Sequence, residues 1–390
     1  MPAHTTHNTP ALRFPGYTGV WEQQKLDDLY IFAGSGGTPK STNQQYYNGS
    51  IPFLGISDIT GRDITKTKKT ITEEGLHHST AWIVPAGAIS LAMYASVGEI
   101  GILTHDTATS QAFYNMVFDD DRVRDFIYYR LFKAAEQAEY EPLISTGTQR
   151  NLNAEKIKNF TVQVTSVDEM GAIGHFFRKL DDLINLHQRQ TQKLTELKQG
   201  LLQNMFPREG ESVPRLRFPG FTTNWKQQKL GDIYNFHYGE FNNNPDNNGP
   251  YPVYGANGII GGYTKFNAED SSIIGHIGAA GYVKWGMGKH FVTYNGTIAK
   301  PAASSLDSKF GYYALSNKKI YKICAGSGRP FVSYADLNSI DMRIPNDLLE
   351  QKKISLLFTR LDDLLALHEQ YIVKLTQLKK GLLQKMFPQD

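Results

Sequence analysis

The sequence predicts an α+β protein with an internal repeat, in which two β-rich mixed α/β domains are separated by two long helices that pair as an antiparallel coiled coil. Three observations predict this fold: one segment repeated near the start of each half, one heptad-patterned segment repeated near its end, and short strand-like runs between them. With 390 residues, 40% of them hydrophobic, the chain has room for two or three domains that each bury a core.

Two pairs of segments define the repeat. Residues 12–32 and 216–236 are identical at 14 of 21 positions, at an offset of 204 residues. Residues 177–207 and 358–388 are identical at 19 of 31 positions, at an offset of 181 residues. Similar ends around dissimilar middles are expected if the ends share a structural role while the middles recognise different things. The alternative is a duplication whose loops have drifted.

The regions between the repeated segments predict one curved sheet each, because short β-forming runs alternate there with Gly, Pro, Asn and Ser. MYASVGEIG and HIGAAGYVK correspond when Gly98 is aligned with Gly281, so the two regions are expected to share a fold. Each region ends in a polar glycine loop, STGTQRNLNAEKI or AGSGRPFVSYADL, which could hold a phosphate or be an ordinary turn. The predicted strands are Ile51–Leu54, Ala81–Val84, Ala88–Met93, Gly101–Leu103, Tyr251–Tyr254, Ser272–Gly275, Gly281–Trp285 and Phe291–Tyr294.

Both repeated helices carry start and stop signals. A capping box is predicted from Ser166 to Glu169, with Asp347 and Glu350 in the second copy, and each helix ends at an M-F-P sequence. Leucine and histidine recur every seven residues, with a second row interleaved, which predicts a coiled-coil seam. The two seam histidines are expected to hydrogen-bond across the interface rather than to bind metal. The predicted seam residues are Leu180, Leu183, His187, Leu194, Leu197, Leu201, Leu361, Leu364, His368, Leu375, Leu378 and Leu382.

These patterns divide the chain into four parts. The predicted boundaries are residues 12–165 for the first domain, 166–207 for the first spacer helix, 216–345 for the second domain and 346–388 for the second spacer helix.

Composition excludes several classes of protein. The single cysteine, Cys324, cannot form an internal disulfide or supply a zinc finger. No signal peptide and no bilayer-spanning run is visible, so a cytoplasmic location without membrane contact is expected. The formal net charge is only +3, so binding to DNA would depend on local patches and not on a global field.

Most motifs for enzyme chemistry are absent from the sequence. The chain has no Pro-Pro of the kind found in base-amine methyltransferase loops and no Walker A sequence, and Cys324 has no identifiable base. Asp246 together with Asp307 and Lys309 matches a metal-nuclease pattern formally, but so short a pattern arises often by chance. We therefore expect a binding protein with no catalytic residue, no metal site and no cofactor of its own.

The duplicated opening segment, the strings YPVYGANGIIGGY, SIIGHIGAAGYVKW and AGSGRPFVSYADLNSI, and the helix ends LKKGLLQKMFP resemble the specificity subunit of type I restriction–modification systems. The resemblance covers residues 12–388. It implies two target-recognition domains that each read one half of a split double-stranded DNA target. It also implies two methyltransferase subunits docked on the helices, and restriction subunits. S-adenosylmethionine, ATP and Mg²⁺ would then belong to those partners.

Candidate DNA contacts should lie on loops and carry donors or acceptors that reach base edges or phosphates. Two other classes of function remain open at this point: a self-contained nuclease or methyltransferase, and a coiled-coil scaffold that does not bind nucleic acid. Leu194, Leu197, Leu375 and Leu378 are expected to be spacer core, with their exposed neighbours meeting the methyltransferase subunits. The candidate DNA contacts are Thr38, Lys40, Ser41, Tyr94, Ser96, Ser110, Gln111, Tyr114, Thr148, Gln149, Arg150, Tyr238, Asn257, His276, Lys284, Tyr294, Asn295, Ser327 and Arg329.

Overall fold

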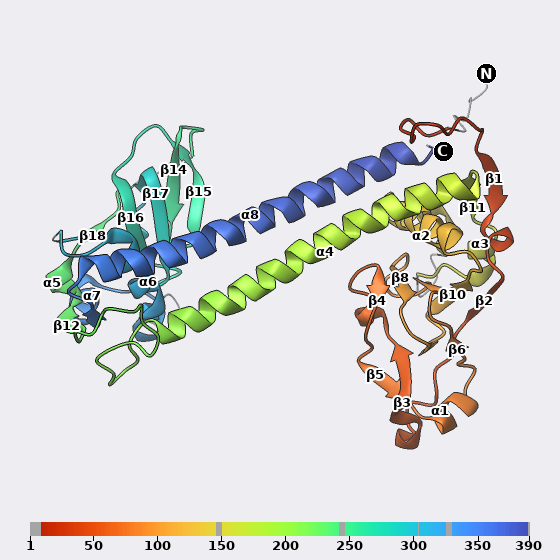
Figure 1. Cartoon of the computed structure of the whole chain (residues 1–390), viewed down its shortest axis with the longest axis horizontal. Helices are drawn as coiled ribbons and strands as arrows, with labels where there is room; N and C mark the ends of the chain where they lie inside the picture. Colours follow the sequence, from red (N-terminus) through yellow and green to blue (C-terminus); the bar gives the residue numbers. More distant parts are fainter. Residues whose placement is uncertain (1–8, 146–149, 242–245, 303, 325–329, 389–390) are drawn as a thin grey trace. The chain divides into compact units, whose positions relative to one another are not determined.

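The chain forms two compact units. The computed structural model describes residues 9–145, 150–241, 246–302, 304–324 and 330–388 (Figure 1). The first unit comprises Met1–His187 and Gln370–Asp390, and the second comprises Gln188–Glu369. Each unit therefore contains one β-rich lobe together with parts of both long helices. The boundaries between the units fall inside the two predicted spacer helices.

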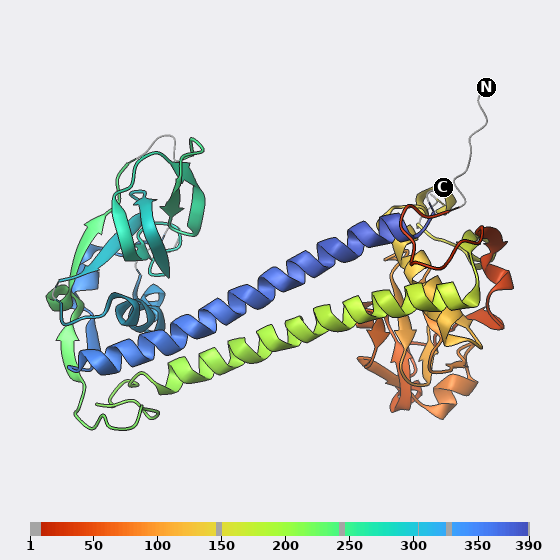
Figure 2. The ribbon, with the colours of Figure 1, turned by 45° about the horizontal axis from the view of Figure 1, so that its top comes forward.

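Two sheets form the lobe of the first unit, which Figure 2 shows from a second direction. The strand orders are β2-β10-β7-β8-β4 and β5-β3-β9-β6, and a separate pair joins β1 to β11. All residues of β7 and β8 are buried, as expected for apolar runs at a sheet centre. The elements are β1 (Glu22–Lys25), β2 (Phe32–Ser35), β3 (Tyr47–Leu54), β4 (Asp63–Ile64), β5 (Lys69–Ile71), α1 (Glu73–His77), β6 (Ile83–Val84), β7 (Ile89–Ala92), β8 (Ile100–Leu103), β9 (Thr107–Thr109), β10 (Phe113–Val117), α2 (Asp121–Glu136), α3 (Ala154–Lys158) and β11 (Thr161–Val164).

One larger sheet forms the lobe of the second unit, with the order β13-β18-β16-β17-β14-β15, and β12 pairs with β19 beside it. The predicted strands Gly281–Trp285 and Phe291–Tyr294 are wrong as separate elements, because residues 283–285 and 291–292 belong to one strand, β17. A Cβ on Gly286, between the two predicted strands, would lie 2.3 Å from His290 Nε2, so a larger residue there would displace this buried side chain. The elements are β12 (Lys226–Lys229), α5 (Leu230–Ile233), β13 (Tyr234–Tyr238), β14 (Tyr251–Gly255), β15 (Gly258–Tyr263), β16 (Ala268–Gly275), β17 (Val283–Val292), β18 (Gly296–Pro301), α6 (Ser308–Asn317), α7 (Tyr334–Ser339) and β19 (Asp341–Ile344).

Two long helices complete the fold, α4 (Val167–Asn204) and α8 (Leu348–Met386). Within the described ranges, no helix has an apolar stretch long enough to cross a membrane.

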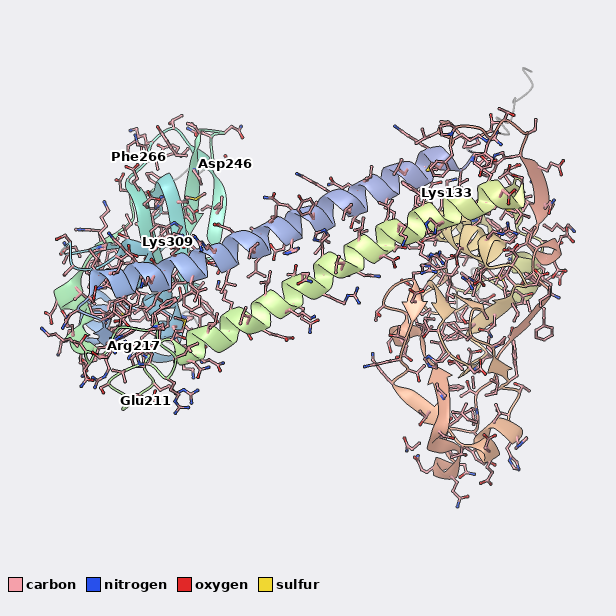
Figure 3. All side chains as sticks on the ribbon, in the orientation of Figure 1. Lys133, Glu211, Arg217, Asp246, Phe266 and Lys309 are labelled. Carbon is pink, nitrogen blue, oxygen red and sulfur yellow. The ribbon has the colours of Figure 1, made fainter. Side chains whose placement is uncertain are left out.

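A buried glutamate near the start of each long helix binds an arginine of the repeated opening segment. Arg13 Nη2 lies 2.6 Å from Glu169 Oε2, and Arg217 Nε lies 2.6 Å from Glu350 Oε1; Figure 3 labels Arg217. The predicted capping box is therefore only half correct. The Glu169 amide donates to Ser166 Oγ at 3.4 Å, but the Glu169 carboxylate turns to the arginine. A guanidinium supplies two N–H donors, which suits a carboxylate removed from water.

Helices α4 and α8 pair in an antiparallel orientation. In the first unit Lys379 Nζ lies 2.6 Å from Asp181 Oδ1, and the His187 ring stacks on Tyr371 with 4.9 Å between centroids. Residue numbers along α8 therefore fall as those along α4 rise.

The predicted interleaved row of the seam is wrong by one residue. Leu183, Leu197, Leu364 and Leu378 are 44%, 51%, 43% and 49% exposed. Positions 183 and 184 follow Leu180 by three and by four residues, and both spacings fit a heptad pattern, so only contact with the partner helix decides which one is covered. The buried or half-buried rows are Leu180, Ile184, His187, Thr191, Leu194, Lys198 and Leu201 on α4, and Leu361, Leu365, His368, Ile372, Leu375, Lys379 and Leu382 on α8.

The core of the first unit includes an aromatic residue from the far end of the second repeat. Phe387, just after α8, lies 5.2 Å from Phe126, 6.1 Å from Phe177 and 6.3 Å from Trp21, measured between ring centroids. All four rings are buried. The first lobe therefore closes its core with a residue more than 200 positions away from these three neighbours in the chain.

The second unit repeats this arrangement with the roles exchanged. Phe206, just after α4, lies 5.6 Å from Phe310, 6.0 Å from Phe358 and 6.1 Å from Trp225. Each lobe is thus completed by the end of the long helix that belongs to the other repeat.

We expect Phe387→Ala to destabilise the first unit by about 3–5 kcal/mol, because it removes a buried ring. Phe206→Ala should do the same to the second unit. Hydrogen exchange measured by mass spectrometry on β7 and β16 reports the two units separately.

The matched control is Leu378→Ala, an exposed position on α8, which should change stability by less than about 0.5 kcal/mol. Equal loss of protection in β7 and β16 after Phe387→Ala alone would contradict separate closure of the two cores.

Candidate nucleic-acid interface

Backbone hydrogen bonds join three loop segments of the first lobe. The Gly37 amide donates to Thr109 O at 2.9 Å, and the Met93 amide donates to Ala112 O at 2.7 Å. These bonds hold the segment after β2, the β7–β8 loop and the turn before β10 together. We call the surface formed by residues 36–41, 93–99 and 109–112 the loop face of the first unit.

The second lobe holds its loops by the same bonds. The Glu240 amide donates to Val292 O at 3.0 Å, and the His276 amide donates to Asn295 O at 2.7 Å. Each position here lies 203 or 183 residues after its counterpart in the first lobe. The β14–β15 turn adjoins these loops, because a Cβ on Gly278 would lie 3.9 Å from Ala256 Cβ. The loop face of the second unit comprises residues 239–241, 255–258, 276–282 and 292–295.

Most of the predicted contacts in the first lobe lie on or beside this face. Thr38 Oγ1 donates to Gln111 Oε1 at 2.6 Å. Arg150 is exposed but binds Glu141, with Nη2 2.6 Å from Oε1, so part of its charge is already neutralised. Thr148 and Gln149 lie outside the described residues. The exposed predicted residues are Thr38, Lys40, Ser41, Ser96, Gln111 and Arg150, and the half-buried ones are Tyr94 and Ser110.

Tyr114 is a wrong prediction. It lies inside β10, is 1% exposed, and its hydroxyl lies 2.7 Å from that of Tyr30. Burial raises the pKa of the Tyr114 hydroxyl, which keeps it neutral in the core. The sequence run that contains it reads as a turn followed by a strand, and the strand begins one residue before Tyr114.

The predicted residues of the second lobe divide in the same way. Asn257 occupies the β14–β15 turn, and Lys284 lies in β17 beside the loop face. Ser327 and Arg329 lie outside the described residues. The exposed predicted residues are Tyr238, Asn257, Lys284 and Tyr294, and the half-buried ones are His276 and Asn295.

An aromatic cluster borders the loop face of the second unit. The Tyr238 ring lies 3.9 Å from Tyr334 and 4.3 Å from His276, measured between centroids. His276 Nδ1 lies 2.7 Å from Val332 O, so this nitrogen is the donor. In the neutral ring Nε2 is then an acceptor, suited to a base amino group.

Sequence reasoning missed one prominent residue of this face, Phe241. Its side chain is 70% exposed, and its ring lies 5.6 Å from that of Tyr294. The available signal was a single aromatic residue at the start of an asparagine-rich run, EFNNN. Because Phe carries no hydrogen-bonding group, a search for donors and acceptors passes over it.

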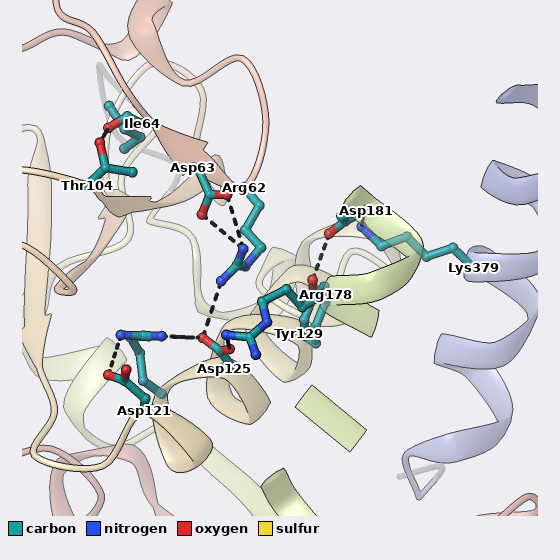
Figure 4. Close-up of polar contacts among 11 residues, drawn as sticks. Arg62, Asp63, Ile64, Thr104, Asp121, Asp125, Tyr129, Arg178, Asp181 and Lys379 are labelled. Carbon is teal, nitrogen blue, oxygen red and sulfur yellow. Dashed lines mark hydrogen bonds and ion pairs between the residues drawn. The ribbon is translucent and has the colours of Figure 1, made fainter. Parts of the chain in front are cut away.

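A cluster of arginines in the first unit has a structural role instead. Asp125 accepts from Arg124 at 2.7 Å, pairs with Arg178 on α4 at 3.2 Å and with Arg62 beside β4 at 3.5 Å (Figure 4). Burial raises the pKa of the neighbouring Asp63 carboxyl. These guanidinium groups connect the sheet, α2 and α4, so they contribute to the join between lobe and helix and not to an exposed basic patch.

The formal metal-nuclease pattern does not form a site. Asp246 accepts the amides of Asn248 and Gly262 at 3.1 Å, and these bonds lower the pKa of its carboxyl. Asp307 caps α6 by accepting the Phe310 amide at 2.8 Å. Figure 3 shows Asp246 and Lys309 on separate parts of the second unit. Among the described residues no group of three or more His, Cys, Asp or Glu is arranged to hold a metal ion.

Comparison with a protein family supports the resemblance seen in the sequence. The model for the type I restriction modification DNA specificity domain matches the chain twice, at residues 19–196 and 222–377. The two matches together cover most of the chain, one in each repeat.

Individual relatives and structures agree with this match. The type I restriction enzyme MjaIX specificity subunit of Methanocaldococcus jannaschii is 28% identical over 231 residues, 55% of this chain and 51% of that protein. The HindI specificity subunit of Haemophilus influenzae is 25% identical over 190 residues, 47% of this chain and 40% of that protein. The chain thus spans about half the length of these relatives or less. The crystal structure of a type I restriction–modification S subunit from M. genitalium has the same fold, with a TM-score of 0.74, 19% identity, and coverage of 98% of this chain and 100% of that one.

Proposed function

The chain belongs to the family of type I restriction–modification DNA specificity subunits, and from this premise we propose that it selects the DNA sequence on which its partners act and does no chemistry itself. One observation carries the proposal. The two units repeat the same buried contacts and the same loop-holding bonds, yet they present different side chains on their loop faces. A duplicated frame with distinct exposed residues suits two readers of different short sequences.

Each lobe reads one half of a split double-stranded DNA target. The first loop face offers hydroxyl, amide and ammonium groups, for example Thr38, Gln111 and Lys40, which suit base edges and phosphates. The second offers rings as well as polar groups, for example Tyr238, Tyr294 and Asn257. The unread bases between the halves then follow from the two helices, which connect the lobes.

The long helices dock two copies of a methyltransferase subunit. Matched leucines support this assignment: Leu183, Leu186 and Leu378 are exposed in the first unit, and Leu364, Leu367 and Leu197 in the second. The members of the two sets are related by the 181-residue offset of the repeat. Exposed leucines beside a coiled-coil seam favour contact with another protein. Two equivalent sets suit two copies of one partner.

Methyl transfer and DNA cleavage belong to the partners. Methyltransferase subunits would supply S-adenosylmethionine chemistry, and restriction subunits would use ATP and Mg²⁺. The absence from the sequence of a methyltransferase amine loop and of a Walker A motif supports this division of labour.

Replacing residues 33–165 with the equivalent region of a relative should change one half of the methylated motif and leave the other half unchanged. The physical reason is that each lobe has its own core and its own loop face. Sequencing of methylated adenines in a host that carries the partner subunits reads both halves at once. Replacement of residues 237–345 is the reciprocal control, and a change in both halves after either exchange would contradict modular reading.

Leu183→Glu should remove one of the two methyltransferase copies, because a carboxylate on an apolar contact must be desolvated. The double change Leu183→Glu and Leu364→Glu should remove both copies. Native mass spectrometry of the co-expressed complex counts them.

Asn185→Glu adds the same charge two residues further along α4, on the other flank, and should leave two copies bound. Retention of both copies by the double variant would show that the leucine sets are not the docking surface.

A further inference from the structure

One pair of exposed side chains on the first loop face, Thr38 and Gln111, is structurally equivalent to a pair on the second, Phe241 and Tyr294. The backbone bond from Gly37 to Thr109 in the first lobe corresponds to that from Glu240 to Val292 in the second. Glycine precedes each donor, because the strands approach so closely that a Cβ on Gly36 would lie 2.0 Å from Thr109 O. In the second lobe a Cβ on Gly239 would lie 2.3 Å from Val292 O. The same crossing of the chain is therefore built twice.

The side chains that follow this crossing differ in chemistry. One residue after the donor and two after the acceptor, the first lobe has Thr38 and Gln111, joined by a 2.6 Å hydrogen bond. The same steps in the second lobe lead to Phe241 and Tyr294, whose rings lie 5.6 Å apart with an angle of 43° between their planes. Both pairs are exposed.

The fold does not require rings at these positions. The first lobe makes the same crossing with a polar pair, so the aromatic pair is not needed to hold the loops together. Phe241 is 70% and Tyr294 43% exposed, which leaves considerable apolar surface in water. This exposed apolar surface is available for contact with a ligand.

The residues beside each pair also differ, since they are aromatic in the second lobe and not in the first. In the second lobe Tyr294 adjoins Asn295, whose carbonyl accepts a hydrogen bond from the His276 amide, and the His276 ring packs at a tilt against Tyr238. The register of the strands places Ser35 and Met93 of the first lobe where the second has Tyr238 and His276. The aromatic character therefore extends along the second loop face and is absent from the matching positions of the first.

We infer that this pair of positions determines sequence preference in both lobes, through hydrogen bonds to base edges from Thr38–Gln111 and through apolar contact with bases from Phe241–Tyr294. The inference rests on the proposed function and adds the residues and the type of contact. Hydroxyl and amide groups discriminate bases by their donors and acceptors. Rings act through thymine methyl groups or by entering a base step.

Two isosteric changes test the difference between the pairs, since each removes one hydroxyl. In the complex with its methyltransferase subunits, Thr38→Val should lower methylation of the wild-type target about tenfold and relax one base of one half-site. Tyr294→Phe should change methylation less than about twofold. The combined change Phe241→Ala and Tyr294→Ala should lower methylation about tenfold or more and alter only the other half-site. One bidentate base contact is worth about 1–3 kcal/mol, which corresponds to these factors.

The readout is sequencing of methylated DNA from libraries in which one half-site at a time is randomised, with thermal unfolding of each complex as a control for folding. If the wild-type motif is split but the double alanine variant retains it at the wild-type rate, the assignment of this pair is overturned and the proposed function stands. If the wild-type complex methylates an undivided motif, the proposed function fails, and the inference fails with it. Equal loss after Tyr294→Phe and after the double alanine change would overturn apolar reading.

Discussion

Closure of each core by the end of the other repeat's helix is the constraint on which the rest of the structure depends. Phe387 completes the core around Trp21, and Phe206 completes the core around Trp225. Burial of a ring of this size stabilises a core by about 3–5 kcal/mol, a large part of the stability of an ordinary domain. A repeat of the sequence is therefore not a folding unit, because neither repeat contains all of the side chains that its lobe needs.

Two lysine–aspartate ion pairs set the register of the two long helices and attach the helix pair to each lobe. Lys379 and Lys198 occupy seam rows that are otherwise mostly apolar, where they bind Asp181 and Asp362. Each aspartate also accepts a tyrosine hydroxyl from its lobe, at 2.8 Å in the first unit and 2.7 Å in the second. Because a partly buried charge without its partner is costly, a shift of the helices by one heptad would be penalised. The same three-residue link in both units sets the register and joins each helix pair to a lobe.

This arrangement separates the residues that maintain the fold from those available to recognise a ligand. The cores, the arginine–glutamate pairs and the loop-holding bonds are repeated, while the exposed side chains of the two loop faces differ in kind. Substitutions on a loop face leave the buried contacts unchanged, so one frame can present two chemistries. The chain belongs to the DNA specificity family, in which such variation of exposed side chains on a constant frame suits the recognition of different sequences.

The sequence by itself determined the repeat, the two long helices and the α+β class, because these follow from identity at fixed offsets, from heptad periodicity and from the short strand-like runs. The antiparallel direction is the simplest pairing of two helices in one chain, and the contacts Lys379–Asp181 and His187–Tyr371 confirm it. Tertiary structure alone decided which leucines are covered, since positions 183 and 184 both satisfy the heptad and only the partner helix distinguishes them. It also decided that the Glu169 carboxylate pairs with Arg13 and does not cap the helix, that Tyr114 is buried in the core and that Phe241 is exposed. In each case the outcome depends on residues distant in the sequence. Arg13 supplies the ion pair of Glu169, distant side chains cover Tyr114, and none covers Phe241 fully.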